Sequence, residues 1–246
     1  MEATKPMARI VPIALVLLLT ACAGHDNSRA GSGLAGLDVA RAALAGGSPE
    51  IALNVTNAIL ASKPDDVPAL VSQGDAFSAL GRSDDAQASY AKALAGDPES
   101  VEAQIGLGRL RLNSDPAQAQ LLFLKVLQHD PRNTVALNDL GIAYDLQAKH
   151  DSAQAAYRQA LGAEPTMRAA EVNLALSMAL SGQAPAAVAL LKPLASAPNA
   201  SRRLRHDLAV ALAMAGDKPA AAQILGADMA PEEVDRALAA YGEFGP

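Results

Sequence analysis

The sequence has few of the residues that usually build strands, nucleic-acid interfaces or disulfide frameworks. Only 3% of its 246 residues are aromatic, none of them tryptophan, and it contains a single cysteine, Cys22. One cysteine cannot form an intrachain disulfide, so the fold has to be stable without a covalent cross-link. The formal net charge is −6 and no run of lysine or arginine is present, which excludes an electrostatic surface for nucleic acid. Half of the residues are hydrophobic and alanine dominates, a composition that favours helices.

Sequence signals of catalysis are also lacking. The chain contains no GxSxG or HExxH motif and no glycine-rich phosphate loop. Adjacent carboxylates such as Asp84 and Asp85 fall at expected helix starts, where the helix dipole explains them. The four histidines are not paired at the spacing of metal ligands: His25, His129, His150 and His206. We therefore expect no enzyme activity, no cofactor or metal, and no small-molecule substrate.

The first 21 residues have the layout of an export signal. Lys5 and Arg9 precede an apolar stretch at 10–19, which is shorter than the roughly 20 apolar residues that a membrane span needs. The tetrapeptide at 19–22, Leu-Thr-Ala-Cys, resembles the lipobox of bacterial lipoproteins. The resemblance implies a signal peptide at 1–21, cleavage before Cys22, and lipidation of this cysteine. The alternatives are an ordinary export signal with an incidental cysteine and an uncleaved membrane anchor.

Residues 22–33 read as a lipidated, flexible tether. From Ala23 to Gly33 the sequence AGHDNSRAGSG has no apolar period. A flexible coil of about 11 residues spans roughly 17–20 Å, which would hold a domain just clear of the lipid headgroups. In the lipoproteins that the lipobox resembles, an aspartate after the cysteine tends to retain the protein at the inner membrane, and here this residue is Ala23. The resemblance therefore implies a lipid-anchored outer-membrane protein that faces the periplasm.

Beyond the tether the chain repeats itself. Prolines at Pro64, Pro98, Pro131 and Pro165 are spaced by 34, 33 and 34 residues. This is the period of the tetratricopeptide (TPR) repeat, a helix-turn-helix unit. In the unit that starts at position 1 with Val67, the small and aromatic residues of the TPR pattern also match: Gly74, Phe77, Ala86, Tyr90 and Ala93. The pattern predicts a close helix crossing with glycine at position 8 and a ring at position 24, so the rings form the framework and not a ligand site.

Six such units fit the chain. They occupy residues 34–230 in one register, with one residue missing near Asn113, and Pro231 to Phe244 starts a further helix within the segment 231–246. We predict an all-α TPR superhelical solenoid whose last segment, 231–246, caps the array, because a terminal repeat must cover its outer apolar face. Pro193 falls inside the second helix of the fifth unit, where it should kink or shorten this helix.

A narrower resemblance comes from the C-terminal half. The segments 173–181 (NLALSMALS), 189–195 (ALLKPLA) and 207–217 (DLAVALAMAGD), together with the lipobox and the repeats, resemble the TadD lipoproteins of the tight-adherence (Flp) pilus machine. The resemblance implies a non-catalytic adaptor that helps a pilus secretin assemble or stay in the outer membrane. Two alternatives stay open: a pilotin-like TPR lipoprotein of type IV pili, and an envelope scaffold for other periplasmic proteins such as peptidoglycan hydrolases.

A TPR array acts through the groove that the first helix of each unit lines. From the fourth unit onward, the expected groove positions become apolar, which predicts a binding surface for an amphipathic helix or an extended apolar segment of a partner. The residues are Ile142, Leu146, Val172, Leu176, Leu180, Val210 and Met214. The alternative is that these side chains belong to the core. A carboxylate clamp is not expected, because the groove positions supply only Arg109 and Arg203 as cations, far apart in the array.

Overall fold

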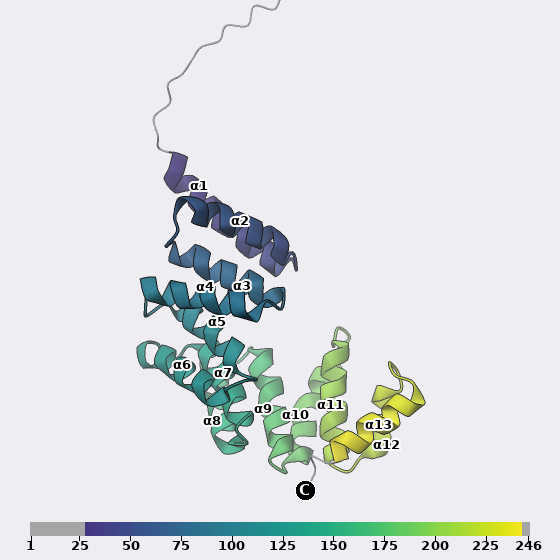
Figure 1. Cartoon of the computed structure of the whole chain (residues 1–246). Coiled ribbons are helices and arrows are strands. Elements are labelled where there is room, and N and C mark those ends of the chain that lie inside the picture. The colour runs from purple at the N-terminus through teal and green to yellow at the C-terminus, as the bar shows by residue number, and fades with distance from the viewer. Residues whose placement is uncertain (1–27, 243–246) are drawn as a thin grey trace, which may run out of the picture.

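The computed structural model describes residues 28–242, and their regular structure is entirely helical (Figure 1). The predicted all-α TPR solenoid is confirmed for this part of the chain. Thirteen helices follow one another: α1 (Ser28–Ala45), α2 (Pro49–Ser62), α3 (Val67–Ala79), α4 (Ser83–Gly96), α5 (Val101–Arg111), α6 (Pro116–His129), α7 (Thr134–Asp145), α8 (His150–Ala163), α9 (Arg168–Leu180), α10 (Ala184–Ala195), α11 (Arg202–Met214), α12 (Lys218–Leu225) and α13 (Pro231–Gly242).

The helices stack in chain order as six pairs, α1–α2 to α11–α12, followed by α13 (Figure 1). Each helix packs against the next, and the first helices of neighbouring pairs also pack side by side, such as α7 with α9 and α9 with α11. Among the described helices, α5 and α7 pack less closely than the other neighbouring first helices. The array therefore has a seam between its third and fourth pairs.

The turns between the two helices of a pair contain a left-handed residue in every pair but the third, α5–α6. Gly47, Gly81, Gly182 and Gly216 have φ values of 70, 71, 81 and 86°, which glycine adopts without a steric penalty. In the fourth pair, Ala148 takes this place with a φ of 57°. An alanine in this region carries backbone strain.

The crossing within each pair depends on a small residue that faces a large one. A Cβ built on Gly74 would lie 2.6 Å from the Tyr90 ring, and one on Gly141 would clash with the Tyr157 ring. Both rings are almost fully buried. The predicted role of glycine at position 8 is thus explained by the ring at position 24.

The fifth and sixth pairs solve the same problem without rings. In the fifth, Ala175 stands at position 8 and Leu191 at position 24, and both are buried in one cluster. In the sixth, Ala209 and Leu225 occupy these positions and are also buried together. Where alanine replaces glycine at position 8, leucine therefore replaces the larger aromatic residue at position 24, and the packed volume is conserved.

The two ends of the array differ in how they match the prediction. Helix α1 begins at Ser28, so residues 28–33, which the sequence assigns to the tether, are helical. The physical reason is that extending an existing helix costs less than nucleating one. At the other end, α13 packs through Val234 and Leu238 onto α11 and α12. The predicted signal peptide at 1–21, Cys22 and residues 243–246 of the predicted cap lie outside the described residues.

Pro193 lies inside its helix, as predicted, and close to the C-terminal end. Helix α10 contains 12 residues, whereas α4, α6 and α8 contain 14 each, and it ends two residues after the proline, at Ala195. The proline lies in the last turn, where the loss of one backbone hydrogen bond interrupts little of the helix.

Candidate protein-binding groove

Three hollows open along the first helices of the pairs. The first, of about 320 Å³, is lined by α1, α3 and α5; the second, of about 510 Å³, by residues of α3 and α5 and the start of α7; and the third, of about 380 Å³, by α7, α9 and α11. Because the same helices pack in a row, the hollows belong to one surface, which we call the groove.

The N-terminal half of the groove is polar. Asp75 lines the first two hollows together with Glu102, and it accepts a hydrogen bond of 2.6 Å from the Tyr90 hydroxyl. Desolvation raises the pKa of the Asp75 carboxyl, and the bond from Tyr90 partly offsets this. The pKa of Tyr90 is also raised, first by its burial and then by the charge of Asp75. The hydrogen bond from the Tyr90 hydroxyl orients the Asp75 side chain.

Arg109 is engaged across the seam. Its Nε lies 2.6 Å from Oδ2 of Asp139, whose side chain is only 4% exposed. This ion pair joins α5 to α7 at the place where these helices pack less closely. Arg109 is thus a structural cation and does not offer its full charge to a ligand.

The third hollow has a mixed lining, to which Ile142 and Val172 of the seven predicted residues contribute. The seven residues divide into three groups by their burial. Leu146 and Leu180 are exposed to 49% and 42%. Met214 is only 8% exposed. The partly buried residues that pack against core clusters are Ile142, Val172, Leu176 and Val210. The structure therefore leaves a partly exposed apolar stripe across α7, α9 and α11.

Met214 corrects the predicted groove. It is part of the core cluster that also contains Leu191 and Leu208. Helix α11, the first helix of the sixth pair, is packed by α9, α10 and α12. Its C-terminal end therefore faces the core and not solvent. Leu176, in contrast, contacts the same core while part of its side chain remains at the surface.

Several residues of the third hollow were missed by the reasoning from sequence, Arg168 and Asn173 among them. Arg168, the first residue of α9, and Asn173 line the third hollow together with Arg203 of α11 and Asn138 of α7. Arg168 stands at repeat position 1, outside the positions read as groove-lining. A signal was present, because Arg168 and Arg203 are about one repeat apart in the sequence.

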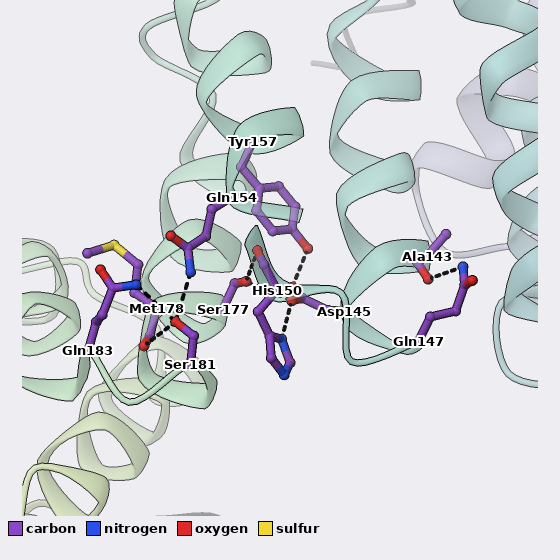
Figure 2. A network of polar contacts seen from close by, with 10 residues as sticks. All are labelled: Ala143, Asp145, Gln147, His150, Gln154, Tyr157, Ser177, Met178, Ser181 and Gln183. Atoms are coloured by element: carbon purple, nitrogen blue, oxygen red, sulfur yellow. Dashed lines mark hydrogen bonds and ion pairs between the residues drawn. The ribbon is translucent and has the colours of Figure 1, made fainter. Parts of the chain in front are cut away.

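A polar network joins α7, α8 and α9 (Figure 2). The Asp145 carboxylate at the end of α7 accepts hydrogen bonds from the Tyr157 hydroxyl at 3.0 Å and the Ser177 hydroxyl at 2.6 Å. Nδ1 of His150 lies 2.8 Å from the same carboxylate. All three groups converge on one acceptor, so the network ties α7, α8 and α9 together and does not activate the serine as a nucleophile.

The described residues show neither a metal centre nor a membrane span. Within residues 28–242, no group of three or more histidine, cysteine, aspartate or glutamate side chains is placed to hold a metal ion. No helix of this part of the chain is both long and apolar enough to cross a membrane.

Comparisons with known proteins agree with this architecture. Models of the tetratricopeptide repeat match residues 71–114 and 135–167. The chain has the TPR fold. TPR folds are typically non-catalytic scaffolds that bind protein partners.

Similar solved structures include PilW and PilF. PilW, described as a widely conserved type IV pilus biogenesis factor, is 24% identical, with a TM-score of 0.74, 84% of this chain covered and 98% of that one. PilF of Pseudomonas aeruginosa is 17% identical, with a TM-score of 0.70, 87% of this chain covered and 100% of that one. At these identities the likeness concerns the fold.

A curated relative is the CTR9 homolog of Arabidopsis thaliana, 40% identical over 108 residues, which are 43% of this chain. The match spans only 10% of the length of this relative, so it reflects similar repeats and not similarity over the whole protein.

Proposed function

We propose that this chain is a non-catalytic adaptor lipoprotein that assists the assembly or localisation of a Flp/Tad-type pilus secretin in the outer membrane. The anchor would be a lipid on Cys22, and the protein would face the periplasm. The proposal is supported by the order of lipobox, repeats and C-terminal segments, which resembles the TadD lipoproteins, and by the similar fold of PilW and PilF.

The observation that carries the binding role is the exposed part of the apolar stripe. Leu146 and Leu180 stand at the same repeat position of α7 and α9, and each keeps more than two fifths of its surface in solvent. Burying one leucine side chain fully contributes about 1.5–3 kcal/mol. Two exposed leucines beside Ile142 and Leu176 therefore offer a docking surface for the apolar face of a partner helix or an extended apolar segment.

The test is a pair of charge substitutions on the stripe. Leu146→Asp and Leu180→Asp should leave the helical signal and melting temperature nearly unchanged, because both residues are exposed and a carboxylate there stays in contact with water. Secretin multimers, pili and co-purification of the secretin should be lost. Leu121→Asp is the matched control, because Leu121 is 66% exposed on α6, outside the groove, and this variant should keep all three properties. Normal pili in a stable Leu180→Asp strain would contradict groove binding.

A secretin of a type IV pilus is the second candidate partner. It is favoured by the likeness to PilW, which extends over 84% of this chain. Mass spectrometry of the protein that co-purifies with the wild type and not with Leu180→Asp would distinguish the two secretins.

A further inference from the structure

The third hollow carries positive charge in a chain that is acidic as a whole. Arg168 and Arg203 line it from α9 and α11, while the formal net charge of the sequence is −6. The only carboxylate that lines it is Asp207. Two guanidinium groups against one carboxylate leave an excess of positive charge at this place.

Both arginines are available to a ligand. Neither forms an ion pair within 4.0 Å with another of the described residues, whereas Arg202 and Arg205 on the same helix pair with Asp228 at 3.7 and 3.5 Å. The arginines of α11 thus divide into two that hold the loop before α13 and one that faces the hollow.

Two carboxamides provide neutral donors beside the arginines. Nδ2 of Asn173 donates to Oδ1 of Asn138 at 2.9 Å, and Nδ2 of Asn138 donates to Asp139 at 3.1 Å. Each of these amide nitrogens carries a second hydrogen that these two bonds do not use. The bond between the two asparagines fixes their orientation, and Asn138 is buried.

The rest of the lining is mostly apolar, with Ser201 as its one polar residue. Ile142, Val172 and Leu204 contribute to the walls, and the first two also belong to the apolar stripe. A ligand that fills this hollow therefore has to present an anionic group next to apolar side chains.

We propose that the third hollow binds an acidic side chain, aspartate or glutamate, of the apolar partner segment that lies in the groove. This inference rests on the proposed groove binding and adds the chemistry of the partner. Guanidinium groups match a carboxylate in geometry as well as in charge. Asp207 is the anion that competes with the ligand. Its burial raises the pKa of its carboxyl group, and the neighbouring Arg203 lowers this pKa. Asp207 therefore interacts with the same positive charge that the carboxylate of the ligand would contact.

The experiment selects peptides from a random library displayed as internal segments, with no free C-terminus, on the immobilised full chain. The wild type should enrich sequences with an aspartate or glutamate at a fixed spacing from leucine, isoleucine or valine. Arg168→Gln and Arg203→Gln should each weaken a selected peptide about tenfold in calorimetry, because each removes a charge-assisted hydrogen bond. Lys192→Gln on α10 removes the same charge outside the hollow and should leave the affinity unchanged.

A variant of opposite sign makes the test sharper. Asp207→Asn removes the competing carboxylate and should tighten binding of the same peptide, whereas replacing the acidic residue of the peptide by its amide should cancel the effects of all three variants. Enrichment of apolar peptides without an acidic preference would overturn this inference and leave the groove proposal intact. No enrichment at all would overturn both. If the preference requires a free C-terminal carboxylate in a second library, the side-chain assignment is wrong.

Discussion

Gly141→Ala tests the packing rule on which the whole array depends. The added Cβ would lie 2.6 and 2.7 Å from two atoms of the Tyr157 ring, whereas carbon atoms normally approach to about 3.5–4.0 Å. The ring cannot move freely, because it is buried and its hydroxyl bonds Asp145 at 3.0 Å.

The expected cost follows from three contributions. Overpacking costs about 1–3 kcal/mol, and displacing the hydroxyl from its buried acceptor costs a further 1–3 kcal/mol or so. The gain in helix propensity recovers about 1 kcal/mol. We expect Gly141→Ala to lower the free energy of unfolding by about 1–5 kcal/mol and the melting temperature by roughly 2–20 °C.

Two further variants make this prediction refutable in urea or thermal unfolding followed by circular dichroism. Gly162→Ala in α8 is the matched control: its Cβ would meet nothing within 4 Å, so it should stabilise by up to about 1 kcal/mol. In a Tyr157→Leu background, which imitates Leu191 opposite Ala175, Gly141→Ala should cost much less. An equal cost in both backgrounds would refute the steric explanation.

The remaining predictions concern one turn, one groove residue and the anchor. Ala148→Gly should raise the free energy of unfolding in urea by about 0.5–1 kcal/mol. It removes the strain of a left-handed alanine at φ 57°, and the higher conformational entropy of the unfolded chain offsets part of this gain. Leu176→Asp should unfold at clearly lower urea than Leu180→Asp, because Leu176 packs against the core and an unpaired carboxylate there costs several kcal/mol; equal midpoints would contradict this. Metabolic labelling with a fatty-acid analogue should mark the wild type and not Cys22→Ser, and equal labelling would remove the lipid anchor.

Much of the fold was predictable because the repeat has a fixed period and few residue types satisfy its crossings. The proline spacing set the register, and glycine opposite a ring, as in Gly74 and Tyr90, located the crossings. The start of α1 was not predictable from composition, because Gly31 and Gly33 disfavour helix locally while the helix behind them extends through both.

The groove was predictable in outline and not in detail. Repeat positions select the side of a helix, and Leu146 and Leu180, which they assign to the groove, are exposed. They do not report how closely the next helices pack, which is why Met214 was assigned to the groove although it is buried. Arg168 was not predicted, because a hollow between three helices is lined by residues at the ends of the helices as well as in their middles.

The chemistry of the groove also indicates where a partner would be held. In the N-terminal half, the polar groups either face water or are already paired, as Arg109 is with Asp139, and exposed ion pairs contribute about 0–1 kcal/mol. In the C-terminal half, each buried leucine would contribute more than that. In the proposed groove binding, affinity would therefore concentrate on α7, α9 and α11, at the end of the array that lies away from α1 (Figure 1). With the proposed anchor on Cys22, this arrangement would leave the first three pairs as a spacer between the membrane and the bound segment.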